Sequence, residues 1–114
     1  MNPSPIPSQI KAPHGAPWVE LHWPDASVHR IPTAILRGYC PCAGCQGHNG
    51  PITFQAGRDS ELIELEGVGN YGLKLAWGDR HDTGIYTYRF LRQLGELYTA
   101  HGAALPERVP QIGR

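Results

Sequence analysis

The sequence has no excess of charge of either sign. Among its 114 residues, ten lysines and arginines balance ten aspartates and glutamates, so the formal net charge at pH 7 is zero. Non-specific binding to nucleic acids and to anionic membranes depends on a broad positive field. The basic residues are also scattered along the chain. Both observations argue against nucleic acid and against a membrane surface as partners.

Long apolar runs are also missing. No stretch approaches the roughly 18 consecutive apolar residues of a membrane-spanning helix. The first residues, MNPSP, have neither the basic start nor the apolar stretch of a secretory signal peptide. We therefore expect a cytoplasmic protein without a membrane segment. Because a chain of this length usually folds around one hydrophobic core, we predict that 1–114 is a single metal-binding domain.

Cysteine is scarce, and its three residues all fall in the six-residue segment Cys40-Pro41-Cys42-Ala43-Gly44-Cys45. Three cysteines cannot all pair within one chain, and a disulfide across a single intervening residue would be strained, so a reduced setting suits them. Isolated cysteines often serve as small buried apolar residues. Their concentration here instead favours a metal site, since proline and glycine supply the bends that bring them together.

Three thiolates leave one place in the tetrahedral coordination that zinc prefers. His48 and His81 are the candidates for this place, and a water molecule is the third option. We favour His81, because it would close a loop of 36 residues, from 45 to 81, and would therefore stabilise the fold more than a close neighbour. The predicted metal ligands are Cys40, Cys42, Cys45 and His81. Zinc fits this set, with iron or an iron–sulfur cluster as the alternative.

Two arginines, Arg37 and Arg80, flank the two ligand segments. A zinc ion with three thiolates carries a formal charge of minus one, which these arginines would offset if they lie close to it. The alternative is that both are ordinary surface residues. For the four remaining histidines, solvent exposure or one hydrogen bond is a sufficient explanation: His14, His22, His29 and His101.

Alternation of apolar and polar residues predicts two β-hairpins. The first joins 18–23 to 28–31, and the second joins 61–68 to 71–77 across a Gly-Asn turn. In the first hairpin, one side of the leading strand is expected to face the core: Val19, Leu21 and Trp23.

Two helices are predicted as well. A short one opens at Pro32-Thr33, where proline suits a first helical turn. A longer one runs from about Tyr86 to Ala100, because apolar residues recur there every three or four positions. Asp82 or Thr83 would cap its start, and Gly102 would end it.

The remaining segments are expected to be irregular. They are a proline-rich lead-in over 1–17 with a hint of an edge strand at Ile6 and Ile10, a loop over 40–60, and a surface tail over 103–114. The folded part then spans about 10–101. The predicted class is α+β: a small antiparallel sheet from two hairpins, a short helix, one longer C-terminal helix and a zinc-bound loop.

Three motifs carry a resemblance to a known family. They are LRGYCPCAGC at 36–45, VGNYGL at 68–73 and WGDRHDTGIY at 77–86. Together they resemble the N-terminal domain of gamma-butyrobetaine hydroxylase, which also occurs as stand-alone bacterial proteins. The resemblance covers Ile10 to Leu97.

The resemblance implies a structural zinc ion bound by Cys40, Cys42, Cys45 and His81. It also marks one departure, because the family usually has glycine where this chain has Arg80. A glycine at that place implies an unusual backbone angle just before the histidine.

Function is also implied by the resemblance. The oxygen chemistry of the hydroxylase belongs to a separate iron- and 2-oxoglutarate-dependent domain, which cannot fit in 114 residues. Relatives of the module are joined to ATPases that carry iron–sulfur clusters. We therefore expect a non-catalytic, metal-binding accessory module whose partner is another protein, either an oxygenase or an iron–sulfur assembly protein.

Four aromatic residues are candidates for contacts with that partner, or else for the core: Trp18, Trp23, Tyr39 and Tyr71. Two alternative functions stay open. One is an iron–sulfur cluster assembly or carrier accessory protein. The other is a small zinc hydrolase in which water takes an open metal position and Asp79 or His81 moves the proton.

Overall fold

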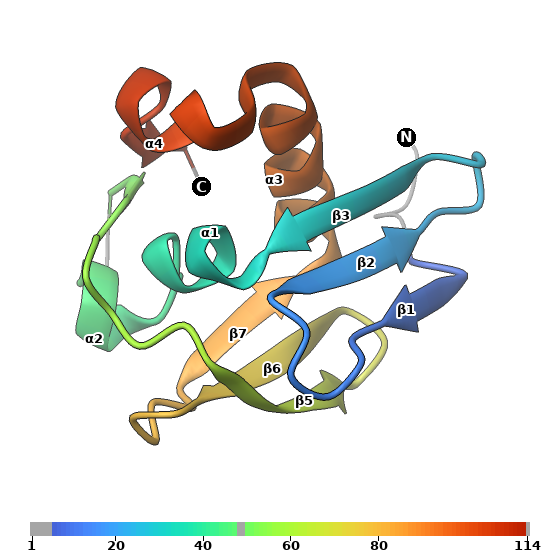
Figure 1. Ribbon diagram of the computed structural model, residues 1–114, viewed down its shortest axis with the longest axis horizontal. Coiled ribbons are helices and arrows are strands. Elements are labelled where there is room, and N and C mark those ends of the chain that lie inside the picture. Colours follow the sequence, from blue (N-terminus) through green and yellow to red (C-terminus); the bar gives the residue numbers. More distant parts are fainter. Residues whose placement is uncertain (1–5, 48–49, 114) are drawn as a thin grey trace.

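The computed structural model describes residues 6–47 and 50–113, and Figure 1 shows how its elements are arranged. The elements in chain order are β1 (Gln9–Lys11), β2 (Trp18–His22), β3 (Val28–Pro32), α1 (Thr33–Gly38), α2 (Ala43–Gln46), β4 (Ile52–Thr53), β5 (Leu62–Val68), β6 (Gly72–Trp77), β7 (Gly84–Thr87), α3 (Tyr88–His101), η1 (Gly102–Ala104), α4 (Leu105–Arg108) and β8 (Gln111–Ile112). None of the helices in the described part of the chain is long and apolar enough to cross a bilayer.

The predicted α+β class is confirmed, and so is the first hairpin. β2 and β3 pair antiparallel, and β1 adds a third strand at the far edge of β2. Val19, Leu21 and Trp23 are buried, as the alternation predicted. The strand hinted at by Ile10 is this edge strand, β1, whereas Ile6 lies before it.

The second hairpin, β5 with β6, is also confirmed, but it does not share a sheet with the first. β7 pairs with the free side of β6, which gives the sheet order β5-β6-β7. The expectation of one sheet was therefore wrong in this detail. The reason is that each hairpin takes its third strand from a segment close to it in the sequence: β1 pairs with β2, and β7 pairs with β6.

The two helices lie close to their predicted positions. α1 begins directly after Pro32. α3 starts at Tyr88, two residues later than predicted, because Tyr86 belongs to β7. Its cap is Thr87, whose hydroxyl accepts a hydrogen bond from the backbone N–H of Phe90 at 3.0 Å. Asp82 and Thr83 are therefore not the caps, since a strand separates them from the helix.

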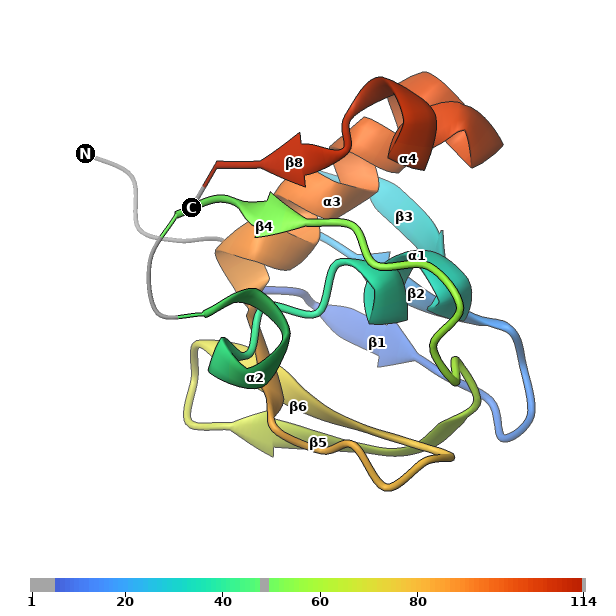
Figure 2. The ribbon, with the colours of Figure 1, turned by 90° about the vertical axis from the view of Figure 1, so that its left-hand side faces the viewer.

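The C-terminal tail is ordered, and the expectation of an irregular surface segment was wrong. Leu105 in α4 is fully buried, and β8 pairs antiparallel with β4. Figure 2 shows β8 beside β4, with α2 below them in this view. Tyr39 donates a hydrogen bond to the carbonyl of Val109 at 2.7 Å. The 40–60 segment, predicted to be a loop, thus contains α2 and β4, and the tail covers it.

α3 packs closely on β3 because it carries a glycine at the contact. A Cβ atom at Gly95 would lie 2.6 Å from the ring of His29. That ring is buried, and its Nδ1 accepts a hydrogen bond from the indole N–H of Trp23 at 2.9 Å. One hydrogen bond therefore accounts for His29, as expected from the sequence.

Candidate metal centre

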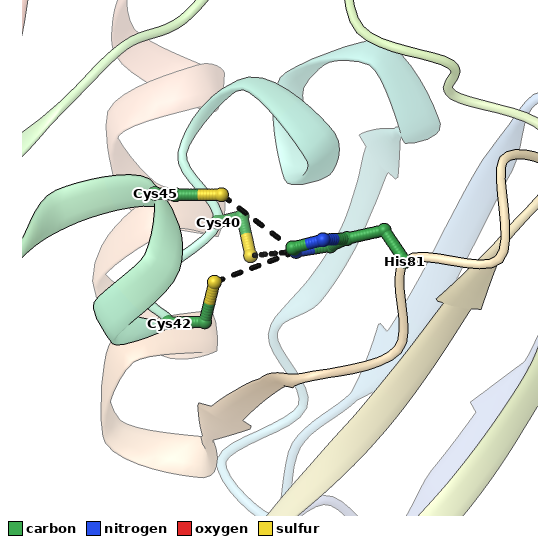
Figure 3. A group of neighbouring side chains, drawn as sticks. All are labelled: Cys40, Cys42, Cys45 and His81. Atoms are coloured by element: carbon green, nitrogen blue, oxygen red, sulfur yellow. Dashed lines mark hydrogen bonds between the residues drawn. The ribbon is translucent and has the colours of Figure 1, made fainter.

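The three cysteines lie at the end of α1 and around the single turn of α2. Tyr39 ends α1, and the backbone N–H of Cys40 donates to the carbonyl of Arg37 at 3.2 Å. Cys42 is the N-cap residue of α2, and its carbonyl accepts hydrogen bonds from the backbone N–H groups of Cys45 at 3.1 Å and Gln46 at 3.0 Å. In this arrangement the three sulfur atoms point toward the ring of His81, as Figure 3 shows.

Two glutamines hold the cysteine segment in place. The side chain of Gln46 donates to the carbonyl of Cys40 at 2.9 Å and exchanges two hydrogen bonds with the backbone of Thr53, at 2.8 and 3.0 Å. Gln55 donates from its amide to the carbonyl of Cys45. Sequence reasoning missed both residues, because only the paired β4 strand reveals that the loop returns beside the cysteines.

His81 is positioned by a tight turn after β6. The N–H of Arg80 donates to the carbonyl of Trp77 at 2.8 Å, and the N–H of Trp77 donates to the carbonyl of His81 at 2.9 Å. Asp79 is a turn residue, and its carboxylate accepts from the N–H of His81 at 3.1 Å. Arg80 has a φ of 69°. The unusual backbone angle expected at this position is therefore present, and it explains why glycine would suit the turn.

The structure brings the four predicted side chains together. The Nε2 atom of His81 lies 3.4 Å from the sulfurs of Cys40 and Cys42 and 3.6 Å from that of Cys45. All four ligand atoms lie within 4.8 Å of one another. The alternative ligand, His48, lies outside the described residues.

This spacing fits a central cation better than it fits hydrogen bonding alone. One imidazole nitrogen offers a single proton or a single lone pair, so it cannot satisfy three sulfur atoms at once. In a tetrahedral site with zinc–sulfur and zinc–nitrogen bonds of about 2.3 and 2.0 Å, each sulfur would lie about 3.5 Å from the nitrogen. The donor set and its geometry therefore suit a metal ion.

The sulfur atoms differ in their exposure. Cys40 and Cys42 are 1% and 7% exposed, whereas Cys45 is partly exposed. Gly84 leaves room beside Cys40, because a Cβ atom there would lie 2.6 Å from the sulfur. Tyr86, farther along β7, is fully buried and donates to the carbonyl of Leu36 at 2.6 Å. The strand that follows His81 thus packs against the cysteine segment.

The surroundings shift the pKa values of the ionisable groups of the site in different directions. Burial raises the pKa of the Cys40 thiol to about 12. Burial acts in the same direction on Cys42, but hydrogen bonds from Thr83 and from the neighbouring cysteines hold the pKa of Cys42 below its usual value. Burial and the charge of Arg37 lower the pKa of His81, which keeps the imidazole neutral and free to bind a cation. Cation binding must displace thiol protons, so it is favoured as pH rises.

Of the two flanking arginines, Arg37 lies at the site. It is 2% exposed, and its Nη1 donates to the sulfur of Cys45 at 3.6 Å. Its Nη2 lies 3.9 Å from the carboxylate of Asp79. Arg80 is exposed in the turn. Arg37 therefore lies where the predicted charge compensation requires it, whereas Arg80 is a surface residue.

The aromatic candidates divide into two groups. Trp23 and Tyr39 are buried in the core. Trp18 is partly exposed, with the guanidinium of Arg30 4.1 Å from its ring centroid, and Tyr71 is 51% exposed. Only the latter two can contact another molecule without a rearrangement of the core.

Comparison with known proteins gives one family and several solved structures. A family model described as gamma-butyrobetaine hydroxylase-like, N-terminal, matches residues 10–92. A crystal structure of a protein of unknown function from Acidithiobacillus ferrooxidans, assigned to the DUF971 family, is 29% identical, with a TM-score of 0.60 over 81% of this chain and 92% of that chain. No curated protein matches the chain significantly.

Two solution NMR structures are also similar to this chain. One is 29% identical, with a TM-score of 0.72 over 93% of this chain and 85% of that chain. The other is 26% identical, with a TM-score of 0.65 over 95% of this chain and 87% of that chain. The match in each case covers most of both chains, so the likeness extends over nearly the whole fold.

Proposed function

The chain belongs to the gamma-butyrobetaine hydroxylase-like N-terminal family, and we propose that it is a non-catalytic zinc-binding module that acts through contact with another protein in the cytoplasm. The observation that carries the proposal is the position of one imidazole nitrogen 3.4 to 3.6 Å from three cysteine sulfurs. Zinc would be held by Cys40, Cys42, Cys45 and His81. The ion would join the cysteine segment to the turn after β6.

The spacing of the ligand atoms favours a single ion over a cluster. An iron–sulfur cluster places its cysteine ligands on different iron atoms and holds them apart by its own iron and sulfide. Here all four ligand atoms lie within 4.8 Å of one another. This separation suits four bonds to one centre, and three thiolates with one imidazole are a common ligand set of structural zinc.

A closed site supports a non-catalytic role. Catalytic zinc sites keep one position open for water or substrate, whereas four protein ligands complete the tetrahedron. The hydrolase alternative assigned proton transfer to Asp79 or His81. However, Nε2 of His81 faces the sulfurs, and Asp79 accepts the backbone N–H of His81. Both groups are thereby engaged in building the site.

The proposed partner is an oxygenase or an iron–sulfur assembly protein, as the family resemblance implies. Among the four aromatic candidates, Tyr71 is the best placed for such a contact, because it is 51% exposed at the turn between β5 and β6. Exposed tyrosines are enriched at protein interfaces, where the ring supplies contact area and the hydroxyl finds a polar partner.

Anaerobic purification followed by metal and acid-labile sulfide analysis tests the metal assignment. We expect one zinc ion per chain and no sulfide. Iron together with sulfide would replace this proposal by the cluster-carrier alternative. A cobalt-substituted sample should show a tetrahedral spectrum without an exchangeable water. A cobalt-bound water that exchanges with solvent would favour the hydrolase instead.

Titration of isotope-labelled protein with a purified iron–sulfur ATPase, followed by NMR, tests the interaction. We expect shifts at Tyr71 and its neighbours, and weaker binding by Tyr71→Ala. Ile63→Ala is the matched control, since Ile63 is 53% exposed on the neighbouring strand β5. Binding that is equally strong in wild type and Tyr71→Ala would remove Tyr71 from the proposed contact surface.

A further inference from the structure

Arg37 is a buried charge without a complete set of partners. It lies in the last turn of α1 and is 2% exposed. Its Nε has no hydrogen-bond partner among the described residues. A guanidinium in such a place is costly unless opposite charge lies nearby, because burial removes its hydration.

The carboxylate of Asp79 offers only part of the compensation. It is 43% exposed and lies 3.9 Å from Nη2 of Arg37, so solvent weakens the attraction. Nη1 of Arg37 instead donates to the sulfur of Cys45 at 3.6 Å. A divalent ion with three thiolates and a neutral imidazole has a formal charge of minus one, and the guanidinium brings the total to zero.

Cys45 is also the ligand that an attacking molecule would meet first. Its side chain is partly exposed, whereas Cys40 and Cys42 are buried. A metal-bound thiolate remains a nucleophile, and its reactivity rises with the electron density on sulfur. A charged N–H donor draws that density away and holds the sulfur in one orientation.

Building on the proposed zinc site, we infer that Arg37 is a positioning residue that protects the metal-bound sulfur of Cys45. It donates an N–H to this sulfur and neutralises the site. The exposed thiolate thereby stays bound to the ion and resists electrophiles and oxidants. Without Arg37, the same four ligands would form a weaker and more reactive centre.

The test compares zinc-loaded wild type with Arg37→Met and Arg37→Lys, after circular dichroism has established whether each variant folds. Arg89→Met is the matched control, because Arg89 is exposed on α3. Zinc affinity is measured by competition with a chromophoric chelator. Alkylation by iodoacetamide, which forms a thioether at sulfur and releases iodide, is followed at Cys45 by mass spectrometry in excess zinc. The sulfur-to-metal charge-transfer band is recorded on the cobalt-loaded proteins.

We expect Arg37→Met to lose about 10- to 100-fold in zinc affinity, as is usual when a group that supports a ligand is removed. Its Cys45 should be alkylated faster, and its charge-transfer band should move to lower energy. Arg37→Lys keeps the charge without the planar donor and should fall between wild type and Arg37→Met. Arg89→Met should match wild type in all three measurements.

Equal zinc affinity and equal alkylation of Cys45 in Arg37→Met and wild type would overturn the inference. If Arg37→Met does not fold, Arg37→Lys decides, and wild-type alkylation and band energy in that variant would overturn it. The proposed function fails separately, and takes the inference with it, if the wild-type protein itself binds no zinc.

Discussion

Replacing His81 by alanine tests how much the proposed metal link contributes to stability. In the zinc-loaded protein, His81 would be linked through the ion to the cysteine segment, in which Cys45 lies 36 residues before it in the sequence. The three cysteines can still hold an ion in His81→Ala, with water in the fourth place. The variant therefore loses the link between the segments while the cysteine segment remains occupied.

The expected loss follows from chain entropy. Closing a 36-residue loop in the unfolded chain contributes about 4 kcal/mol if a metal link restricts the chain as a disulfide does. A domain of this size has a total stability of roughly 5 to 15 kcal/mol. The loss therefore corresponds to a drop of roughly 10 to 20 °C in melting temperature.

Calorimetry measures the melting of wild type and His81→Ala in excess zinc and again with a strong chelator. The four measurements form a thermodynamic cycle that isolates the contribution of the metal link. With zinc, His81→Ala should melt well below wild type, whereas after chelation the two should differ little, because the link is absent from both. His14→Ala is the control, since His14 is exposed, and it should match wild type in both conditions. A zinc-loaded His81→Ala that melts within about 2 °C of wild type would refute the reasoning, since a lost link of this size predicts a larger shift.

Three further predictions concern glycine spacing, backbone strain and protonation. Gly84→Ala should lower zinc affinity and cost about 1 to 3 kcal/mol of unfolding free energy, because the new Cβ would lie 2.6 Å from the sulfur of Cys40. Arg80→Gly should raise the unfolding free energy by up to about 1 kcal/mol in urea titrations, because a φ of 69° suits glycine better than arginine. NMR should give His29 a pKa below 6.5, since burial lowers it. The unfolded chain then binds the proton more readily, so the stability that neutral His29 supports is lost as pH falls below 6.5.

Each of these predictions has its own control. Gly67→Ala should leave zinc affinity unchanged, because no atom of the described residues lies within 4 Å of a Cβ atom there. Arg80→Val should be less stable than Arg80→Gly, since a branched side chain tolerates this backbone angle poorly. In Trp23→Phe the indole donor to His29 is lost, and the pKa of His29 should move upward. Equal metal binding in Gly84→Ala and wild type, equal stability of the two Arg80 variants, or a His29 pKa at or above 6.5 would each contradict its prediction.

The regular elements were predictable where one face of an element is apolar. Alternation in 18–23 and 71–77 located the strands of both hairpins, and the three-to-four spacing after Ile85 located α3. The cluster of cysteines and the distant His81 also stood out, because few residue types can bind a soft cation. The φ of Arg80 followed from the family glycine at the same position.

The sheet order and the ordered tail were not predictable in this way. β4 and β8 are two residues long, too short to produce a periodic pattern. Their pairing joins Ile52 to Ile112, which are far apart in the sequence. Likewise, nothing local indicates that β7 would pair with the second edge of β6, or that the two hairpins would lie in different sheets.

The sequence by itself determined which metal-binding groups the chain offers, because residue type fixes the three thiols and the imidazole. Only the tertiary structure decided that Arg37 lies buried beside Cys45 and Arg80 lies exposed. It also decided that Gln46 and Gln55 secure the cysteine segment. The physical reason is that charge compensation and hydrogen bonding depend on distances of a few ångströms between segments, and packing of the whole chain sets these distances.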